Sequence, residues 1–349
     1  MSTYTFFLGG SSPDGFRTHF GDIVNDTDYH TYIIKGGPGT GKSTLMKKIA
    51  AAFDEDKEIY LCSSDPSSYD AVVLKERKAV ILDGTAPHVF EPEYAGAVQE
   101  ILNLGQCWDS GKLEQQKGEI IAAHRNYSLH HLRCRRYLSA ASSVIGDTLA
   151  ITESALDIPK LEAFSQRLLK KLVPRKKDSE GRLCYKQISA VTPDGYKTIL
   201  PENDTVYLLN DVNMAATDSF LRKFSELLRN KGYDTEISEC LLMKDSFFEH
   251  MRVPELGISF ISANRYNGLA VENKKPLNFA RFYNKEVLSA KKSRLKFNSA
   301  VSAELTEEAV KCLVSAKTAH DKLEEYYIGA VDFKKADKIC REMIQKLEL

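Results

Sequence analysis

The chain has 349 residues, and at about 150 residues per domain this length predicts two or three domains. Lysine and arginine together number 48, as do aspartate and glutamate, so the formal net charge is zero. A balanced charge argues against a protein that holds nucleic acid by bulk electrostatics, because such binding needs a basic surplus. The 43% hydrophobic and 28% charged content is typical of a globular protein and excludes a disordered chain.

The sequence contains no run of 18 apolar residues, so no transmembrane helix is expected. Residues 1–15 (MSTYTFFLGGSSPDG) have neither the basic region nor the long apolar region of a secretory signal. The seven cysteines are scattered and form no CxxC pair, which disfavours a zinc or redox motif. These features predict a cytoplasmic protein with reduced thiols and no membrane contact.

Two short apolar runs rich in β-branched residues, 31–35 (TYIIK) and 79–83 (AVILD), are typical of buried parallel strands. A helical apolar pattern covers 42–53. From about residue 97 to 172 the sequence is mostly helical, and we expect this stretch either to pack on the domain or to act as a lid over a ligand. This order of elements predicts an α/β fold with a parallel sheet.

Between the first of these strands and the helix lies GGPGTGKS, which satisfies G-x-x-x-x-G-K-[ST] at every fixed position. Glycines allow backbone N–H groups to turn toward phosphate oxygens, and the N-terminus of the following helix adds its positive end. Lys42 would supply positive charge to the β and γ phosphates, and Ser43 a hydroxyl ligand to Mg²⁺. The motif predicts a P-loop NTPase domain whose nucleotide contacts come from Gly36, Gly37, Pro38, Gly39, Thr40, Gly41, Lys42, Ser43 and Thr44.

Asp83 ends the apolar strand 79–83, where a carboxylate would face the ligand crevice of a parallel sheet. We expect it to hold Mg²⁺ together with Ser43, with a helix cap or turn as the alternative. The next residue is Gly84 rather than the glutamate that follows this aspartate in many P-loop ATPases. That difference lowers the expectation of a motor-type ATPase and favours a kinase-like or switch-like enzyme.

Asp65 follows another expected strand and is a candidate base or water-positioning group, although Asp-Pro also favours a turn. His88 lies five residues after Asp83 and is a candidate to contact a phosphate or the substrate, with a structural role as the alternative. Asp70 is predicted to be a cap. Lys42, Asp83, Asp65 and His88 are therefore the candidate catalytic residues.

Four arginines on a probable helix could supply an arginine finger or a lid contact, or could simply form a solvated face: Arg125, Arg133, Arg135 and Arg136. Trp108, the only tryptophan, is expected in the core or at a domain interface.

The sequence also repeats itself, because segments of the first half recur in the second at offsets between 175 and 180. SSPDGFRT at 11–18 matches VTPDGYKT at 191–198, and ALDIPKLEAFSQRLLKKL at 155–172 matches AVDFKKADKICREMIQKL at 330–347. We interpret this pattern as a tandem duplication: a P-loop domain with a helical extension at 1–172, a linker at 173–182 and a second copy at 183–349.

The second copy lacks the nucleotide motifs. Asp211, Ala216, Thr217 and Asp218 stand where the first copy has Gly36, Gly41, Lys42 and Ser43. Met243 and Ser262 stand opposite Asp65 and Asp83. Two carboxylates at this place would repel a triphosphate, so the second copy is predicted to keep the fold without the phosphate chemistry and to dock on the first copy or on a partner.

The segments KGGPGTGKSTLMKKI, CSSDPSSYD and AVILDGTAPH, together with the duplication, resemble a family of Firmicute proteins described as uncharacterised ATP-binding proteins, ATPases or nucleotide kinases. The resemblance covers essentially the whole chain and implies a P-loop NTPase fold and nucleotide binding, without a defined substrate. In that family the second half also carries a P-loop, and this chain departs from the pattern at 211–218.

Together these observations predict Mg-ATP hydrolysis or γ-phosphoryl transfer at the first copy. ATP is preferred to GTP because no N/T-K-x-D guanine motif follows that copy. The alternatives are a small-molecule or nucleotide kinase and a nucleotide-controlled switch with little turnover, which would have a protein partner. No nucleic-acid partner is expected.

Overall fold

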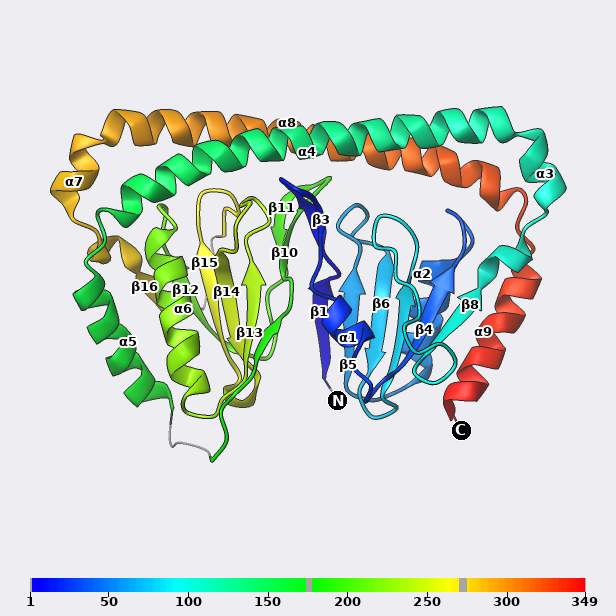
Figure 1. Cartoon of the computed structure of the whole chain (residues 1–349), viewed down its shortest axis with the longest axis horizontal. Coiled ribbons are helices and arrows are strands. Elements are labelled where there is room, and N and C mark those ends of the chain that lie inside the picture. The colour runs from blue at the N-terminus through cyan, green and yellow to red at the C-terminus, as the bar shows by residue number, and fades with distance from the viewer. Residues whose placement is uncertain (1, 174–177, 270–274, 349) are drawn as a thin grey trace.

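In the part of the chain that the structure describes, residues 2–173, 178–269 and 275–348, two mixed β-sheets of six strands each lie side by side beneath two long helices (Figure 1). The coordinates are a computed structural model. The first sheet has the order β1-β5-β6-β7-β4-β8. Its strands are β1 (Thr3–Phe7), β5 (Lys57–Leu61), β6 (Tyr69–Leu74), β7 (Ala79–Asp83), β4 (His30–Lys35) and β8 (Gln99–Asn103).

The predicted buried strands are confirmed as β4 and β7, which pair in parallel at the centre of the first sheet, and the predicted helix is confirmed as α2 (Lys42–Ala52). The expectation of a parallel sheet is wrong in one respect, because β6 runs antiparallel to both of its neighbours. Only residues 75–78 join β6 to β7, and a connection this short permits a hairpin but no crossover. The sheet is therefore mixed, although most of its strands run parallel.

The second sheet has the same strand order and directions, with β9-β13-β14-β15-β12-β16 in the places of the six strands above. Its strands are β9 (Leu183–Tyr185), β13 (Thr235–Glu239), β14 (Phe248–Val253), β15 (Ile258–Ala263), β12 (Thr205–Asn210) and β16 (Lys275–Asn278). Helix α6 (Ala215–Arg229) follows β12 as α2 follows β4. Between the two sheets lie two hairpins, formed by β2 (Gly10–Ser12), β3 (Gly15–Arg17), β10 (Ser189–Thr192) and β11 (Gly195–Thr198).

Helices α4 (Lys117–Glu153) and α8 (Lys292–Ile328) each have 37 residues and lie antiparallel along the top of both sheets (Figure 1). A helix of this length extends roughly 55 Å, enough to bridge from one sheet to the other. Helix α4 begins above the first sheet and ends above the second, whereas α8 runs in the opposite direction. The remaining helical elements are α1 (Gly21–Val24), α3 (Ser110–Gln115), α7 (Lys285–Ala290) and the 3₁₀ turns η1 (Leu104–Cys107), η2 (Pro254–Leu256) and η3 (Phe279–Phe282).

The end helices are exchanged between the two sheets. Helix α5 (Ile158–Leu172) packs beside α6 on the second sheet, and α9 (Phe333–Glu348) packs beside α2 on the first. Cys340 and Met343 of α9 accordingly belong to the core of the first sheet, together with Leu45 and Ile49. The segment 155–172 belongs to the predicted first domain but packs on the second sheet. The domain limits at 172 and 183 stay predictions.

The predicted linker 173–182 lies partly outside the described residues, since 174–177 are not described. Its last residues contact the second half. The Gly181 N–H donates to the Arg229 carbonyl at 2.9 Å, and Arg182 forms an ion pair with Asp234 at 3.2 Å. Within the described residues, including the long helices α4 and α8, no helix combines the length and the apolar character needed to cross a membrane.

Candidate functional site

A glycine-rich loop, residues 36–41, connects the end of β4 to the start of α2 at the carboxyl edge of the first sheet. Gly39 and Gly41 have φ of 65° and 87°, a left-handed conformation that favours glycine. The Thr40 hydroxyl donates to the Gly37 carbonyl at 2.8 Å and closes the loop on itself. The predicted strand–loop–helix context of the phosphate motif is therefore present in the structure.

Lys42, the first residue of α2, reaches back over this loop. Its ammonium donates to the carbonyls of Gly36 at 3.0 Å and Gly37 at 2.9 Å, and lies 3.6 Å from the Asp83 carboxylate. Ser43 accepts a hydrogen bond from the Tyr69 N–H at 2.9 Å. Lys42 and Asp83, which are 41 residues apart in the sequence, thus meet at one place beside the loop.

Asp83 is the last residue of β7, adjacent to β4 in the sheet. Its Oδ1 accepts from the Thr85 N–H at 2.9 Å and the Thr85 hydroxyl at 2.5 Å, and its Oδ2 faces Lys42. Asp83 therefore stabilises the turn and also presents an oxygen to the loop, and its role as a magnesium ligand stays a prediction. A serine hydroxyl and a carboxylate oxygen are ligands that Mg²⁺ accepts, so Ser43 and Asp83 could hold this ion.

His88 lies buried behind Asp83, and both of its ring nitrogens are engaged. Its Nδ1 lies 2.9 Å from the Asp83 carbonyl, and its Nε2 lies 3.5 Å from the Asp70 carboxylate. Burial lowers the pKa of His88, but the contact with Asp70 outweighs burial and leaves the pKa above its ordinary value. A protonated His88 would therefore link Asp70 to the backbone of Asp83, a positioning role that competes with the predicted contact to a substrate.

Asp70 is not a helix cap, which corrects its predicted role. It is a buried residue of β6, at a bulge where the register against β5 shifts. The segment YDAVVL forms strand β6 through this position, and the cap interpretation was wrong because no strand was expected between 65 and 79.

Asp65 occupies the turn between β5 and β6, as its Asp-Pro sequence allowed. It accepts hydrogen bonds from Ser67 at 2.9 Å and Ser68 at 2.7 Å, and its carboxylate lies 3.5 Å from Lys317 of α8. Burial raises the pKa of Asp65, but the two serines and Lys317 lower it more, so the net pKa lies below the usual range. A carboxylate held in its ionised form is a weak proton acceptor and suits an orienting role better than that of a general base.

Helix α8 closes over the glycine-rich loop from above. The Gly39 N–H donates to the Glu324 carboxylate at 3.1 Å. A Cβ atom on Gly37 would meet Tyr327 at 2.6 Å, and one on Gly39 would meet Ile328 at 3.0 Å, so only glycine permits this approach. Sequence reasoning missed these three residues of α8, because they lie about 285 residues from the loop and carry no motif.

Trp108 lies at this junction, as expected for an interface residue. Its ring packs against Tyr327 with centroids 5.9 Å apart and borders Gly37. The four candidate arginines of α4 have exposed side chains, in accord with the solvated-face alternative: Arg125, Arg133, Arg135 and Arg136. Arg135 donates to the Pro13 carbonyl at 3.4 Å, a contact with the β2–β3 hairpin rather than with the loop.

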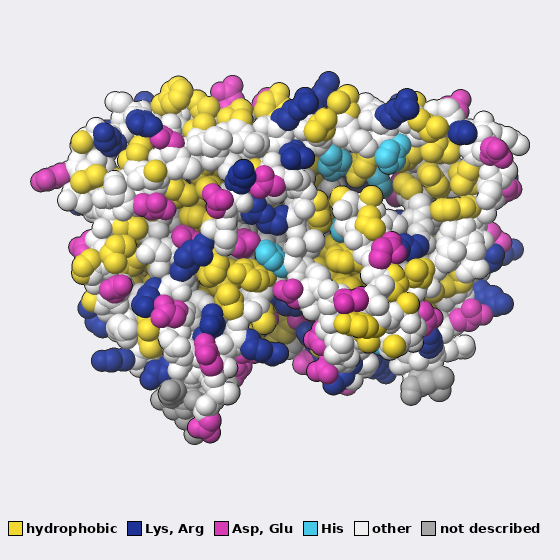
Figure 2. Space-filling model, in the orientation of Figure 1, with side chains coloured by type: hydrophobic (Ala, Val, Ile, Leu, Met, Phe, Trp, Pro, Cys, Tyr) yellow, Lys and Arg dark blue, Asp and Glu magenta, His cyan; other side chains and the backbone are white. Residues whose placement is uncertain are grey.

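An aromatic cluster on the two long helices lies beside this site. Tyr127 of α4 packs against His131 at 4.6 Å and against His320 of α8 at 5.4 Å, measured between ring centroids. Figure 2 shows histidine side chains gathered below the helical pair on the side of the first sheet. Burial lowers the pKa of His131 to about 4, so this ring is neutral at pH 7. Among the described residues, His320, Asp321 and Glu324 also have a spacing that would fit a cation, although exposed groups of this kind are common without one.

The corresponding place in the second sheet is filled by the protein itself. The buried Asp211 carboxylate accepts from the Thr217 N–H at 2.9 Å and from the Tyr283 hydroxyl at 2.9 Å. Asp218 accepts from the Phe248 N–H at 2.7 Å, as Ser43 accepts from Tyr69 in the first sheet. Carboxylates of the chain thus lie against the start of α6.

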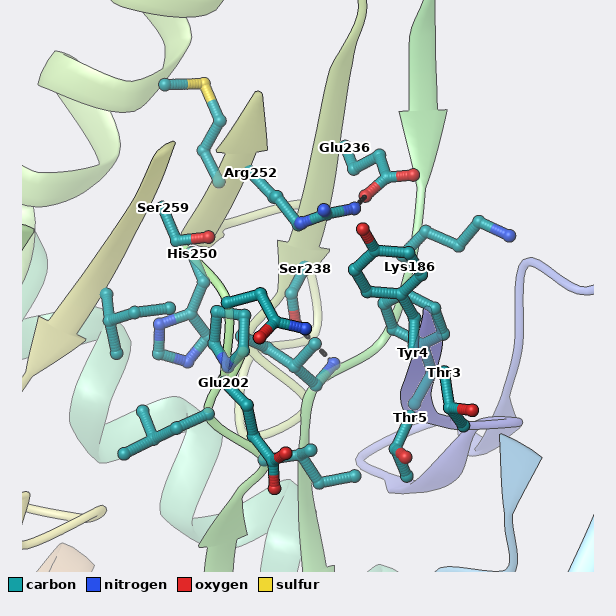
Figure 3. Close-up of a pocket in the computed structure, with 18 residues that line it drawn as sticks. Thr3, Tyr4, Thr5, Lys186, Glu202, Glu236, Ser238, His250, Arg252 and Ser259 are labelled. Atoms are coloured by element: carbon teal, nitrogen blue, oxygen red, sulfur yellow. Dashed lines mark hydrogen bonds and ion pairs between the residues drawn. The ribbon is translucent and has the colours of Figure 1, made fainter. Parts of the chain in front are cut away.

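A cavity of about 260 Å³ lies between the two sheets, at the amino ends of their parallel strands (Figure 3). It is therefore on the opposite edge from the glycine-rich loop. Two basic groups on its walls are paired: Lys186 contacts Glu58 at 2.6 Å, and Arg252 contacts Asp204 at 2.8 Å. Figure 3 also shows the ion pair between Arg252 and Glu236. We place the functional site at the loop rather than in this cavity, because Lys42 and Asp83 converge at the loop.

Comparison of the chain with protein-family models, curated proteins and solved structures gave no match.

Proposed function

We propose that the first sheet carries a P-loop nucleotide site that binds Mg-ATP and cleaves or transfers its γ-phosphoryl group. The observation that carries the proposal is the convergence of Lys42 and Asp83 on a glycine-rich loop that lies between a buried strand and a helix N-terminus. Loops of this geometry bind phosphate through backbone N–H groups and the helix dipole.

The residues have separate roles in this proposal. The N–H groups of the loop and of the start of α2 hold the β and γ phosphates. Lys42 exchanges its bonds to Gly36 and Gly37 for phosphate oxygens and neutralises charge that develops during transfer. Ser43 and Asp83 would hold Mg²⁺, which would neutralise negative charge on the phosphates. His88 and Asp70 fix the position of Asp83 from behind.

Asp65 is the candidate for orienting water or an acceptor hydroxyl, since it lies on the same edge of the sheet beside Lys317. This site would suit two kinds of enzyme: an ATPase, and a kinase for a small molecule or nucleotide. Phosphate transfer to an added acceptor distinguishes them, because only a kinase carries it out.

A second candidate function is a nucleotide-controlled switch, and one contact favours it. Helix α8 connects the second sheet to the loop of the first, so a nucleotide bound at the loop would change the position of this helix. Turnover would then be slow, in keeping with Gly84 at the position after Asp83.

We also propose that the two halves arose by tandem duplication of a P-loop unit. The equal strand orders and the equivalent hydrogen bonds of Ser43 and Asp218 support this origin. Asp211 supports the interpretation that the second copy has lost nucleotide binding, because its carboxylate takes the place of a phosphate.

Replacing Lys42 by alanine tests the nucleotide site. We expect Lys42→Ala to reduce ATP binding or phosphate release on the order of 100-fold or more, because one positive charge of the preorganised site is lost. Phosphate release from Mg-ATP and direct titration of ATP and GTP are the measurements. Lys47→Ala, an exposed lysine on the same helix, is the matched control and should behave as wild type.

Unchanged binding and turnover in Lys42→Ala would refute the P-loop assignment. Steady release that disappears in the variant would identify an ATPase. Tight binding without release would favour the switch or a kinase that lacks its acceptor, and acceptor addition separates the two.

A further inference from the structure

Helix α8 brings an acidic side chain to the phosphate-binding loop of the other sheet. Glu324 accepts the Gly39 N–H at 3.1 Å, and Tyr327 and Ile328, one turn further along the helix, pack against Gly37 and Gly39. On the neighbouring turns, Lys317 faces Asp65 at 3.5 Å. One face of α8 therefore follows the edge of the sheet where the proposed nucleotide would lie.

The Gly39 N–H is one of the donors that a loop of this type offers to phosphate. A backbone N–H points its hydrogen in one direction and forms one strong bond, so Glu324 and a phosphate oxygen compete for it. They also compete electrostatically, because a carboxylate beside the loop repels a triphosphate. Nucleotide binding at this loop would therefore require Glu324 to leave.

The second sheet offers an internal comparison. Helices α4 and α8 end in equivalent contacts: the Asn284 N–H donates to the Ala155 carbonyl at 2.7 Å, and the Asp109 N–H donates to the Ala330 carbonyl at 2.8 Å. The two donors differ by 175 residues in number, and so do the two acceptors. The same shift places Leu149, a buried residue of α4, at the position of Glu324.

The loops below these two positions also differ in where their acidic residues lie. In the second sheet Asp211, a residue of the loop itself, accepts a backbone hydrogen bond at the start of α6, and the helix above has Leu149 at this position. In the first sheet the loop has no acidic residue, and the helix above presents Glu324. A carboxylate thus occupies the corresponding place in both sheets, from within the loop in one case and from the covering helix in the other.

We propose that Glu324 is a residue of the nucleotide site contributed by the far end of the chain, and that it sets nucleotide affinity by holding the anion position until a triphosphate displaces it. This inference rests on the proposed function. Displacement releases the end of α8 from the loop, and because α8 lies along α4, the change reaches the second sheet.

The test compares full-length wild type with Glu324→Gln and Glu324→Ala, and Glu325→Ala, the exposed neighbouring acid, is the matched control. Mg-ATP and inorganic pyrophosphate are titrated by calorimetry. We expect Glu324→Ala to bind both about tenfold more tightly than wild type, since the competitor is removed. Glu324→Gln should show a smaller gain, because its amide oxygen still accepts from Gly39, and Glu325→Ala should show none.

A second readout follows the helix. Hydrogen exchange of the amides at 317–328 should increase when Mg-ATP binds to wild type, because the contacts at Gly37 and Gly39 are broken. In Glu324→Ala the same amides should exchange faster before nucleotide is added.

The outcomes separate the two proposals. Equal or weaker binding by both Glu324 variants, with wild type binding normally, overturns the inference and leaves the nucleotide site in place. Binding by Glu324→Ala alone, with wild type silent, supports both. Absence of ATP and pyrophosphate binding from wild type and every variant overturns the proposed function, and the inference with it.

Discussion

At the scale of single residues, an acidic side chain stands at the β-bulge of each sheet. Asp70 lies where the register of β6 shifts against β5, and Glu249 lies where that of β14 shifts against β13. Asp70 faces His88, whereas Glu249 is fully buried and accepts from Tyr196 at 2.5 Å and Asn264 at 2.7 Å. Burial raises the pKa of Glu249 to about 7, because the two neutral donors offset only part of the lost hydration.

This raised pKa predicts a stability that falls with pH. Between the ordinary carboxyl pKa of about 4.5 and about 7, the folded state binds more protons than the unfolded state, so the free energy of unfolding decreases as pH rises. Above pH 7 the charged Glu249 costs about 3 kcal/mol. We expect Glu249→Gln to be more stable than wild type at pH 8 and about equal at pH 4.5, measured by urea denaturation.

Glu226→Gln, a change at an exposed position, is the control and should leave the pH dependence unaltered. A pH profile of Glu249→Gln parallel to that of wild type would contradict the prediction.

At the scale of elements, the exchange of α5 and α9 decides how each core is completed. The apolar face of α2, with Leu45 and Met46, is covered by the last helix of the chain. Lys48 of α2 pairs with Asp337 of α9 at 2.6 Å on the exposed rim of the same contact. A surface ion pair of this kind contributes little, so burial of apolar side chains supplies most of the stability of the α2–α9 contact.

Truncating a core residue of α9 should therefore destabilise the first sheet. Met343 is 4% exposed and packs in the cluster around Met46. We expect Met343→Ala to lower the free energy of unfolding by about 2–4 kcal/mol, through lost burial and a residual cavity. The measurement is chemical denaturation, with Glu342→Ala on the exposed side of the same helix as the control.

At the scale of the whole molecule, the two halves depend on each other. Residues 1–172 contribute the strands of the first sheet, but their helix α5 and part of α4 pack on the second, and helix α9, which completes the first sheet, comes from the other half. Residues 183–349 contribute the strands of the second sheet, but their helix α9 packs on the first. The fold is therefore one interlocked unit, joined by the long helices α4 and α8.

Separate expression of the halves tests this dependence. A fragment of residues 1–172 should lack a cooperative unfolding transition, because the apolar face of α2 stays exposed. Mixing it with a fragment of residues 173–349 should restore helical content and a sharp transition, followed by circular dichroism and size-exclusion chromatography. A fragment 1–172 that folds alone and binds nucleotide would contradict the interlocked architecture.

Much of the fold and part of the site could be predicted because the signals are local. Strands β4 and β7 are visible as β-branched apolar runs, and α2 as a helical pattern after a glycine-rich loop. Strand β6 was missed because its hairpin to β7 interrupts the expected alternation of strand and helix. The position of Asp70 was mistaken for the same reason.

By itself the sequence determined the glycine-rich loop and the strand that ends in Asp83, because backbone sterics and side-chain periodicity act over a few residues. Only the tertiary structure decided which helix covers which sheet. Glu324 reaches Gly39 across 285 residues, and Met343 completes a core formed near the beginning of the chain. Such contacts depend on how the apolar faces of distant elements fit together, and the local pattern of either element is the same whichever sheet it covers.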